Sequence, residues 1–216
     1  MGKCLHKTTQ GKKGLNMYSQ GIEELYLLDY FKDINNGVLV DIGAADGINN
    51  SNSRKLLELG WSGLLVEPNK KNYNKLKDLY TSNENIILEN VGCSLKTELN
   101  QVFYIDQNDQ YEQLSTFSYD QSVKCKNIFN CGFIEDTIDV YHTTELLLKH
   151  NITNIKFLTI DTEAFDSNVI RGIDFNKIEI ELICIENIDE NAMEILKTNN
   201  YEICFKTDNT FFKKNK

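Results

Sequence analysis

The sequence predicts an α/β protein with a mostly parallel, doubly wound sheet and an antiparallel hairpin at its C-terminal edge. Apolar runs of strand length, such as "GVLVDIG" at 37–43, indicate strands that are buried on both faces. These runs alternate with segments of helical periodicity, as right-handed crossovers between parallel strands require. The last two strand-like runs are joined by "TDNT", which leaves no room for a helix and favours a hairpin.

Composition indicates one domain that binds no long nucleic acid. The chain has 216 residues, 41% of them hydrophobic, which suffices for a single core. We expect a polar, basic tail over 1–17 and one domain over 18–216. A net charge of -9 opposes polyanions, and no apolar run approaches the roughly 20 residues of a membrane helix. We therefore expect a cytoplasmic protein with free cysteine thiols.

The predicted elements follow in order along the chain. Helices are predicted where apolar residues recur at helical spacing, and strands where the apolar run is continuous. The expected helices are 21–31, 51–60, 70–80, 142–151 and 165–173, and the expected strands are 37–43, 61–68, 85–92, 155–161, 180–187, 201–208 and 209–214.

The segment 94–136 is the least regular part of the sequence. "QVFYID" at 101–106 predicts one added strand, and the polar, aromatic stretch after it is too long for an ordinary connector. We expect an irregular insert and interpret it as a candidate substrate lid, with a surface excursion of no function as the alternative. Its aromatic side chains are suited either to stacking on an acceptor or to packing on the sheet: Tyr104, Tyr111, Phe117, Tyr119, Phe129 and Phe133.

The glycine loop "DIGAADG" at 41–47 follows the first predicted core strand. Gly43 permits a tight turn off the strand, and we expect Gly47 to let the backbone approach a ligand. The dinucleotide fingerprint needs glycines where this chain has Ala45 and Ile48. A pyrophosphate is therefore not the expected ligand.

Acidic residues at the strand ends predict a cationic, ribose-containing ligand instead. Asp41 and Asp46 flank the loop, and their carboxylates oppose a phosphate but attract ammonium and sulfonium groups. Glu67 ends the second strand, where an acidic side chain accepts ribose hydroxyls. This combination favours S-adenosyl-L-methionine as the cofactor.

Several segments in order resemble the FkbM-type methyltransferase family: "YSQGIEE", "DIGAADGINNSNS", "GWSGLLVEPN", "ILENVGCS", "FLTIDTEAFDSNVIRGIDF" and "TDNTFF". The resemblance implies a Rossmann-like class I methyltransferase fold with a seven-stranded sheet. It places Asp41, Gly43, Asp46, Gly47 and Glu67 at the cofactor and Asn90 near the adenine. One departure is Ala164, where the family usually has glycine.

The segment "IDTEAFD" is expected to face the transferred methyl group. Asp161, Glu163 and Asp166 are the candidate catalytic residues, because a carboxylate whose pKa is raised by burial and repulsion serves as a general base. His142 is the alternative base, and Asp166 is alternatively a helix cap. Asp161, Glu163 and Glu186 also offer oxygen ligands to a divalent ion, but their spacing fixes no geometry. Cys125, Cys131 and His142 lack zinc-site spacing, so no metal is predicted.

The predicted function is S-adenosylmethionine-dependent methyl transfer. The resemblance favours O-methylation of a hydroxyl on a carbohydrate, glycan or similar small acceptor. Two alternatives remain: a methyltransferase acting on a nucleotide or RNA end, and a non-catalytic module that binds the adenosyl group and recruits partners.

Overall fold

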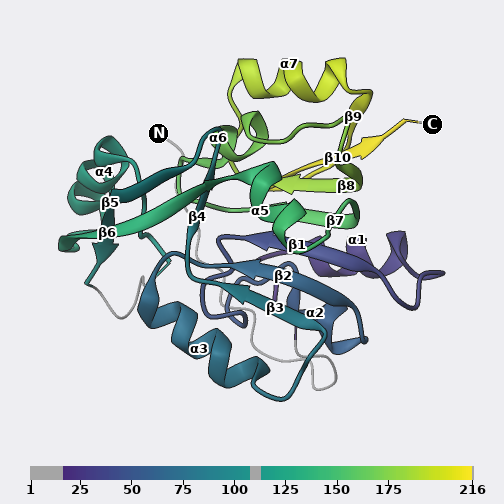
Figure 1. Cartoon of the computed structure of the whole chain (residues 1–216), viewed down its shortest axis with the longest axis horizontal. Helices are drawn as coiled ribbons and strands as arrows, with labels where there is room; N and C mark the ends of the chain where they lie inside the picture. The colour runs from purple at the N-terminus through teal and green to yellow at the C-terminus, as the bar shows by residue number, and fades with distance from the viewer. Residues whose placement is uncertain (1–16, 108–112, 216) are drawn as a thin grey trace.

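A computed structural model describes residues 17–107 and 113–215, so the expected tail at 1–17 lies almost entirely outside the described residues. Its main sheet has seven strands in the order β3-β2-β1-β7-β8-β10-β9 (Figure 1). Pairing is parallel from β3 to β8, whereas β10 is antiparallel to β8 and β9. This confirms the predicted fold class and the C-terminal hairpin. The strands are β1 Val38–Ile42, β2 Ser62–Val66, β3 Ile86–Glu89, β7 Asn154–Ile160, β8 Glu179–Ile185, β9 Tyr201–Lys206 and β10 Thr210–Lys214.

Two layers of helices cover the two faces of this sheet. The first contains α1 Glu23–Tyr30, α2 Arg54–Glu58 and α3 Lys70–Tyr80, and the second contains α5 Thr143–Lys149, α6 Asp166–Arg171 and α7 Glu190–Thr198. In β1, Leu39 packs with the apolar side chains of the first layer, and Val40 packs with those of the second. Burial on both sides explains why the parallel strands lack polar alternation.

The described residues of the segment expected to be irregular form regular elements, so that part of the prediction was wrong, whereas the strand predicted at 101–106 is present within β5 Glu98–Asp106. The segment also contains α4 Tyr119–Phe129 and the start of β6 Phe133–His142. These strands form a second sheet in the order β4-β6-β5, where β4 is Gly92–Ser94, and this sheet lies beside the main one with α4 (Figure 1). The predicted strand 85–92 therefore divides between two sheets.

Exposure explains why β6 of the second sheet was missed. All four residues of β6 from Ile134 to Thr137 are exposed, so this part of the strand is not continuously apolar. The helix α4 begins at Ser118, whose side chain accepts a hydrogen bond from the Gln121 amide at 3.2 Å, and it ends at left-handed Asn130. The helix α7 was also not predicted, although Asp189 caps it by accepting from the Ala192 amide.

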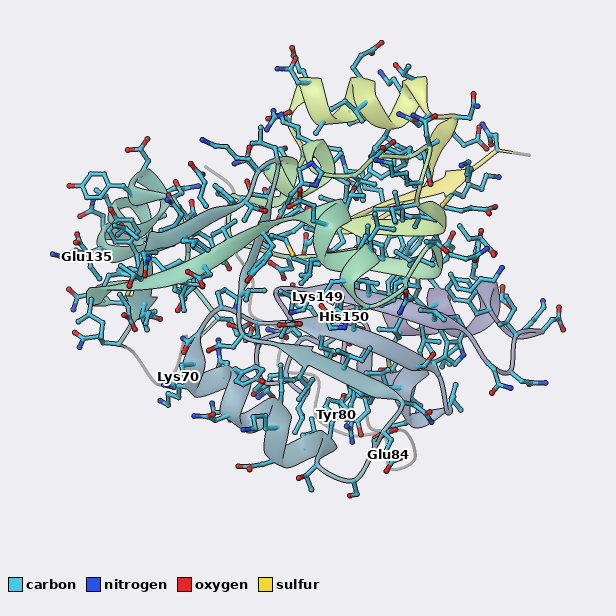
Figure 2. The ribbon with its side chains drawn as sticks, viewed as in Figure 1. Lys70, Tyr80, Glu84, Glu135, Lys149 and His150 are labelled. Atoms are coloured by element: carbon cyan, nitrogen blue, oxygen red, sulfur yellow. The ribbon has the colours of Figure 1, made fainter. Side chains whose placement is uncertain are left out.

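Polar contacts connect distant segments to the main sheet. Buried Glu23 of α1 accepts a hydrogen bond from the Thr207 hydroxyl at 2.5 Å, which holds the C-terminal hairpin against α1. Lys149 ends α5 and His150 follows it (Figure 2), and both contact the Glu89 carboxylate at 2.6 Å. No helix in the described part of the chain is long and apolar enough to cross a membrane. The five cysteines there are free thiols.

Candidate active site

A cavity of about 750 Å³ lies at the carboxyl ends of β1, β2, β7 and β8. Ile42, Val66, Asp161 and Glu186 lie at or directly after these ends and line it. The second sheet and α4 contribute the opposite wall, which includes Phe117. Open α/β sheets bind ligands at this edge, and the volume is typical of a ligand site.

The turn after β1 requires glycine at 43. Gly43 has φ +91°, and a Cβ there would lie 1.8 Å from the Asp161 carbonyl oxygen. Its amide donates to the Val66 carbonyl at 2.9 Å, so the turn connects β1 to both neighbouring strands. Gly47 also has a left-handed φ, but its missing Cβ faces Leu76 of α3 and it does not line the cavity. Packing, rather than ligand approach, explains this second glycine.

Asp41 and Asp46 both line the cavity, in different ways. Asp41 is 5% exposed, and the Ser53 hydroxyl donates to its carboxylate at 2.5 Å. Burial raises the pKa of Asp41 to about 6, and the Ser53 bond opposes that shift. Asp46 accepts from the amides of Ile48 and Asn49 at 2.9 Å, so its carboxylate also closes the turn that follows.

Glu67 lies between the glycine loop and α3. Its carboxylate accepts from the Ala45 amide at 2.8 Å and the Asn69 amide at 2.7 Å. Burial raises the pKa of Glu67 to about 7, although both amide bonds lower it. Asn90 does not line the cavity: its side-chain amide donates to the carbonyls of Glu67 and Pro68 and so supports this loop.

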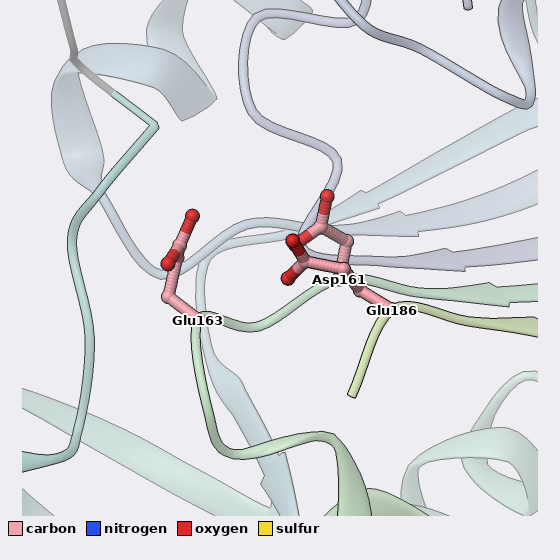
Figure 3. A group of neighbouring side chains, drawn as sticks. All are labelled: Asp161, Glu163 and Glu186. Atoms are coloured by element: carbon pink, nitrogen blue, oxygen red, sulfur yellow. The ribbon is translucent and has the colours of Figure 1, made fainter. Parts of the chain in front are cut away.

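Three carboxyl groups meet on the acceptor side of the cavity. Asp161, Glu163 and Glu186 each place one oxygen within 4.8 Å of the others' (Figure 3). Figure 3 shows the carboxyls of Asp161 and Glu186 against one another, with Glu163 approaching from the loop after β7. Although Asp161 is exposed toward the cavity, desolvation there, the charge of Glu186 and a hydrogen bond between these two carboxyls raise its pKa well above the ordinary value. The close approach of these carboxyls therefore disfavours the ionised form of Asp161.

Glu163 has an unusual backbone and a raised pKa. Its φ is +51° and that of Ala164 is +72°, so two successive residues are left-handed. Strain of this kind persists where surrounding contacts impose it and often marks a functional site. The Thr116 hydroxyl donates to the Glu163 carbonyl at 2.6 Å, and the side-chain amide of Gln121 donates to the Glu163 carboxylate at 3.2 Å. Burial, with the charge of Glu186, raises the pKa of Glu163 to about 7.

Asp166 has a different environment from the other two candidate catalytic residues. It is 1% exposed and does not line the cavity. Its carboxylate accepts from the amide and hydroxyl of Thr162 and from the Asn187 amide at 2.9 Å. Burial raises the pKa of Asp166 to about 6. These bonds hold the loops after β7 and β8 together.

Comparison with known families agrees with this arrangement. The profile of the methyltransferase FkbM domain matches residues 41–209, a span that begins near the end of β1 and includes β2, β7 and β8. The chain belongs to the FkbM methyltransferase family. Membership classes the chain among methyltransferases and confirms the resemblance found in the sequence.

A solved structure of an FkbM methyltransferase shares the fold. The FkbM methyltransferase from Methylobacillus flagellatus superposes with a TM-score of 0.50 at 15% identity, over 83% of this chain. This chain spans only 44% of that protein, and at such identity the likeness concerns the fold alone. Precorrin-6y C5,15-methyltransferase from Geobacter metallireducens gives a TM-score of 0.46 at 13% identity, over 88% of this chain and 84% of that one. No curated protein matches the chain.

The departure at Ala164 from the usual FkbM glycine now has a structural context. With φ +72°, position 164 has the backbone conformation that glycine adopts most readily. Ala164 is exposed and lies outside the main cavity, so its methyl group does not obstruct that cavity. The substitution costs conformational strain and leaves the site open.

Several cavity residues were not predicted. Gln20 precedes α1, Asn209 lies in the β9–β10 turn, and Gln121, Lys124 and Cys125 lie on α4. Gln20 and Asn209 lie in segments that resemble the family, but nothing in those segments indicated a place in the cavity, and the α4 residues carry no motif. The alternative base His142 does not line the cavity, and of the predicted aromatic side chains Phe117 and Phe129 do. Tyr111 lies outside the described residues.

Charge in the cavity is strongly unbalanced. Among the described lining residues, Lys124 is the only lysine or arginine, against six acidic side chains. Such a cavity attracts a cation and repels a phosphate-rich ligand. The six acidic residues are Asp41, Asp46, Glu67, Asp161, Glu163 and Glu186.

Proposed function

We propose that this chain transfers a methyl group from S-adenosylmethionine to a hydroxyl of a carbohydrate or a similar small acceptor. One observation carries the proposal. A single cavity contains the acidic ends of β1 and β2, which suit the cofactor, and the carboxyl cluster after β7 and β8, which suits a hydroxyl acceptor. Family membership independently supports methyl transfer.

The residues present fit S-adenosylmethionine. Each carboxylate oxygen has two acceptor sites, so Glu67 retains capacity for ribose hydroxyls after it accepts its two backbone amides. Asp41 and Asp46 contribute negative charge for the ammonium and sulfonium groups. We assign Gly43 to the turn beside the cofactor, and Gly47 and Asn90 to the support of its loops.

The carboxyl cluster would position and deprotonate the acceptor. Bound S-adenosylmethionine supplies an activated methyl group for in-line displacement, so the chain must align the acceptor oxygen and remove its proton. We assign the base to Glu163, because a pKa of about 7 permits it both to ionise and to accept a proton near neutral pH. Asp161 and Glu186, whose carboxyls lie against one another, would hold the acceptor hydroxyl. Asp166 would position the loop.

Methyl uptake from labelled S-adenosylmethionine tests this function. The acceptor panel contains neutral sugars, acidic sugars and short RNA. We expect label in a sugar and about 10²- to 10⁴-fold less in Glu163→Gln. The matched control is Glu135→Gln, which changes an exposed residue at the far end of the second sheet (Figure 2).

The two alternative functions give different results in the same assay. Label in RNA but in no sugar would favour the RNA-end methyltransferase, which the acidic cavity disfavours. Binding of S-adenosylmethionine without label in any acceptor would favour the non-catalytic module. Equal rates for Glu163→Gln and the unsubstituted protein would contradict the assignment of the base.

A further inference from the structure

A second cavity of about 420 Å³ adjoins the acceptor side of the main cavity. Gln121 and Lys124 of α4 line both cavities. The loop after β7 places Glu163 at the first cavity and Ala164 at the second, and the loop after β8 does the same with Glu186 and Asn187. The second cavity therefore begins next to the carboxyl cluster, where the part of an acceptor beyond its reacting hydroxyl would extend.

Side chains of α6 keep hydrogen-bond donors available to the second cavity. Ser167 accepts from the Asp189 amide, which leaves its hydroxyl hydrogen for another acceptor. Asn168 accepts from Arg171 at 3.0 Å through its carbonyl oxygen, which leaves its amide hydrogens. The Asp189 carboxylate, in contrast, is ion-paired with Arg171 and caps α7 by accepting from the Ala192 amide. The donors on α6 suit a ligand that carries acceptor oxygens.

The charge of the second cavity is opposite to that of the first. Its described charged lining residues are Lys124, Arg171 and Asp189, and Arg171 is ion-paired with Asp189. Lys124 is exposed and forms no ion pair within residues 17–107 and 113–215, although its charge lowers the pKa of Glu163. An anion here would meet Lys124 from α4 and donors from α6.

We propose that the second cavity binds an oxyanion, a carboxylate, sulfate or phosphate, carried by the acceptor beyond its methylated hydroxyl. This assignment rests on the proposed methyl transfer for its role and deepens it by naming an acidic acceptor class. The acceptor lies with its hydroxyl against the carboxyl cluster and its anionic group between Lys124 and α6. The opposite charges of the two cavities then fix the direction in which it binds.

Two oxyanion probes test the proposal without a known acceptor. The ¹⁵N-labelled full chain is titrated with inorganic phosphate and, separately, with glucuronate, and methyl glucoside serves as the uncharged sugar. We expect saturable shifts of the Ser167, Asn168 and Arg171 amides with an oxyanion, and no saturation with methyl glucoside. A response to phosphate alone or to glucuronate alone identifies which oxyanion the cavity accepts.

Lys124→Met and Lys126→Met form a matched pair on α4. Both lysines are exposed, but Lys126 lines neither cavity. We expect Lys124→Met to weaken oxyanion binding about tenfold or more, since charge-assisted bonds are the stronger ones, and Lys126→Met to change it little. Unchanged spectra elsewhere would show that both variants fold.

Three results would overturn the proposal: no saturable shift at these amides with either oxyanion, equal affinity in Lys124→Met and the unsubstituted protein, or saturation by methyl glucoside. The proposed function fails separately. A calorimetric titration of the unsubstituted protein with S-adenosylmethionine tests cofactor binding, and its result does not depend on the oxyanion titrations.

Discussion

At the scale of single residues, Glu163 combines a left-handed backbone, a hydrogen bond from Thr116 and a pKa of about 7. We expect its side-chain carboxyl carbon to titrate near pH 7 in a ¹³C-detected experiment, because burial and the charge of Glu186 disfavour the ionised form. The methylation rate should rise with pH through the same range, since the base acts when ionised. A carboxyl titrating at the ordinary value of 4.5 would contradict this.

Gly43 and Gly60 separate backbone strain from steric overlap. Their φ values are +91° and +94°, but a Cβ at Gly43 would lie 1.8 Å from a carbonyl oxygen, whereas nothing lies within 4 Å at Gly60. We expect Gly60→Ala to lower the free energy of unfolding by about 1 to 3 kcal/mol through strain alone. Gly43→Ala should lose at least about 2 kcal/mol more, because the loop must move. Equal losses by urea unfolding would refute the crowded turn.

At the scale of elements, the segment between β5 and α4 connects the second sheet to the loop of Glu163. Thr116 is completely buried, and its hydroxyl donates to Glu163 and accepts from the Ser118 amide at 3.0 Å. We expect Thr116→Val to cost about 1 to 3 kcal/mol, because two buried backbone groups lose a partner. It should also speed hydrogen exchange at the start of α4. Thr137→Val, on exposed β6, is the control, and equal effects would argue against this connection.

The strands that the sequence predicted most clearly are those with uniform burial. The strands β1, β2, β7 and β8 lie inside the main sheet, so their runs are apolar throughout and unambiguous. Apart from the strand predicted at 101–106, the second sheet and α4 were missed because much of their surface is exposed and their pairing is set by distant segments. The predicted strand 85–92 extended past Glu89, the true end of β3, for the same reason. Only tertiary pairing with β6 places Gly92–Ser94 in the second sheet.

At the scale of the molecule, the buried carboxyls predict an unusual dependence of stability on pH. The pKa values of Asp41 and Asp166 are raised to about 6, and those of Glu67 and Glu163 to about 7. Each group therefore binds a proton more tightly when folded, and its stabilisation is lost as pH rises from the unfolded pKa through the folded one. The urea concentration at the unfolding midpoint should decrease as the pH rises from about 5 to about 8, and this decrease should be smaller in Glu163→Gln. A midpoint that rises over this range would contradict the raised pKa values.

The site was predictable where the fold alone determines position. Asp41 lies near the end of β1, and Glu67 and Asp161 directly follow β2 and β7; the carboxyl ends of such parallel strands meet at one edge, so their order in the sequence sufficed. Lys124 of α4 and Asn209 of the hairpin turn reach the same cavity, and no local pattern indicates that they would. Whether a carboxylate faces the cavity or a buried loop, as Asp166 does, also depends on tertiary contacts.

Calorimetric titration with S-adenosylmethionine, and separately with NAD, tests the central claim most directly. Glu67 and Asp41 lie at the strand ends, and six acidic side chains line the cavity. We therefore expect saturable binding of the sulfonium cofactor and none of NAD. Glu67→Gln and Asp41→Asn should each weaken this binding, whereas Glu135→Gln should not. Absence of S-adenosylmethionine binding, or equal binding of NAD, would contradict the account.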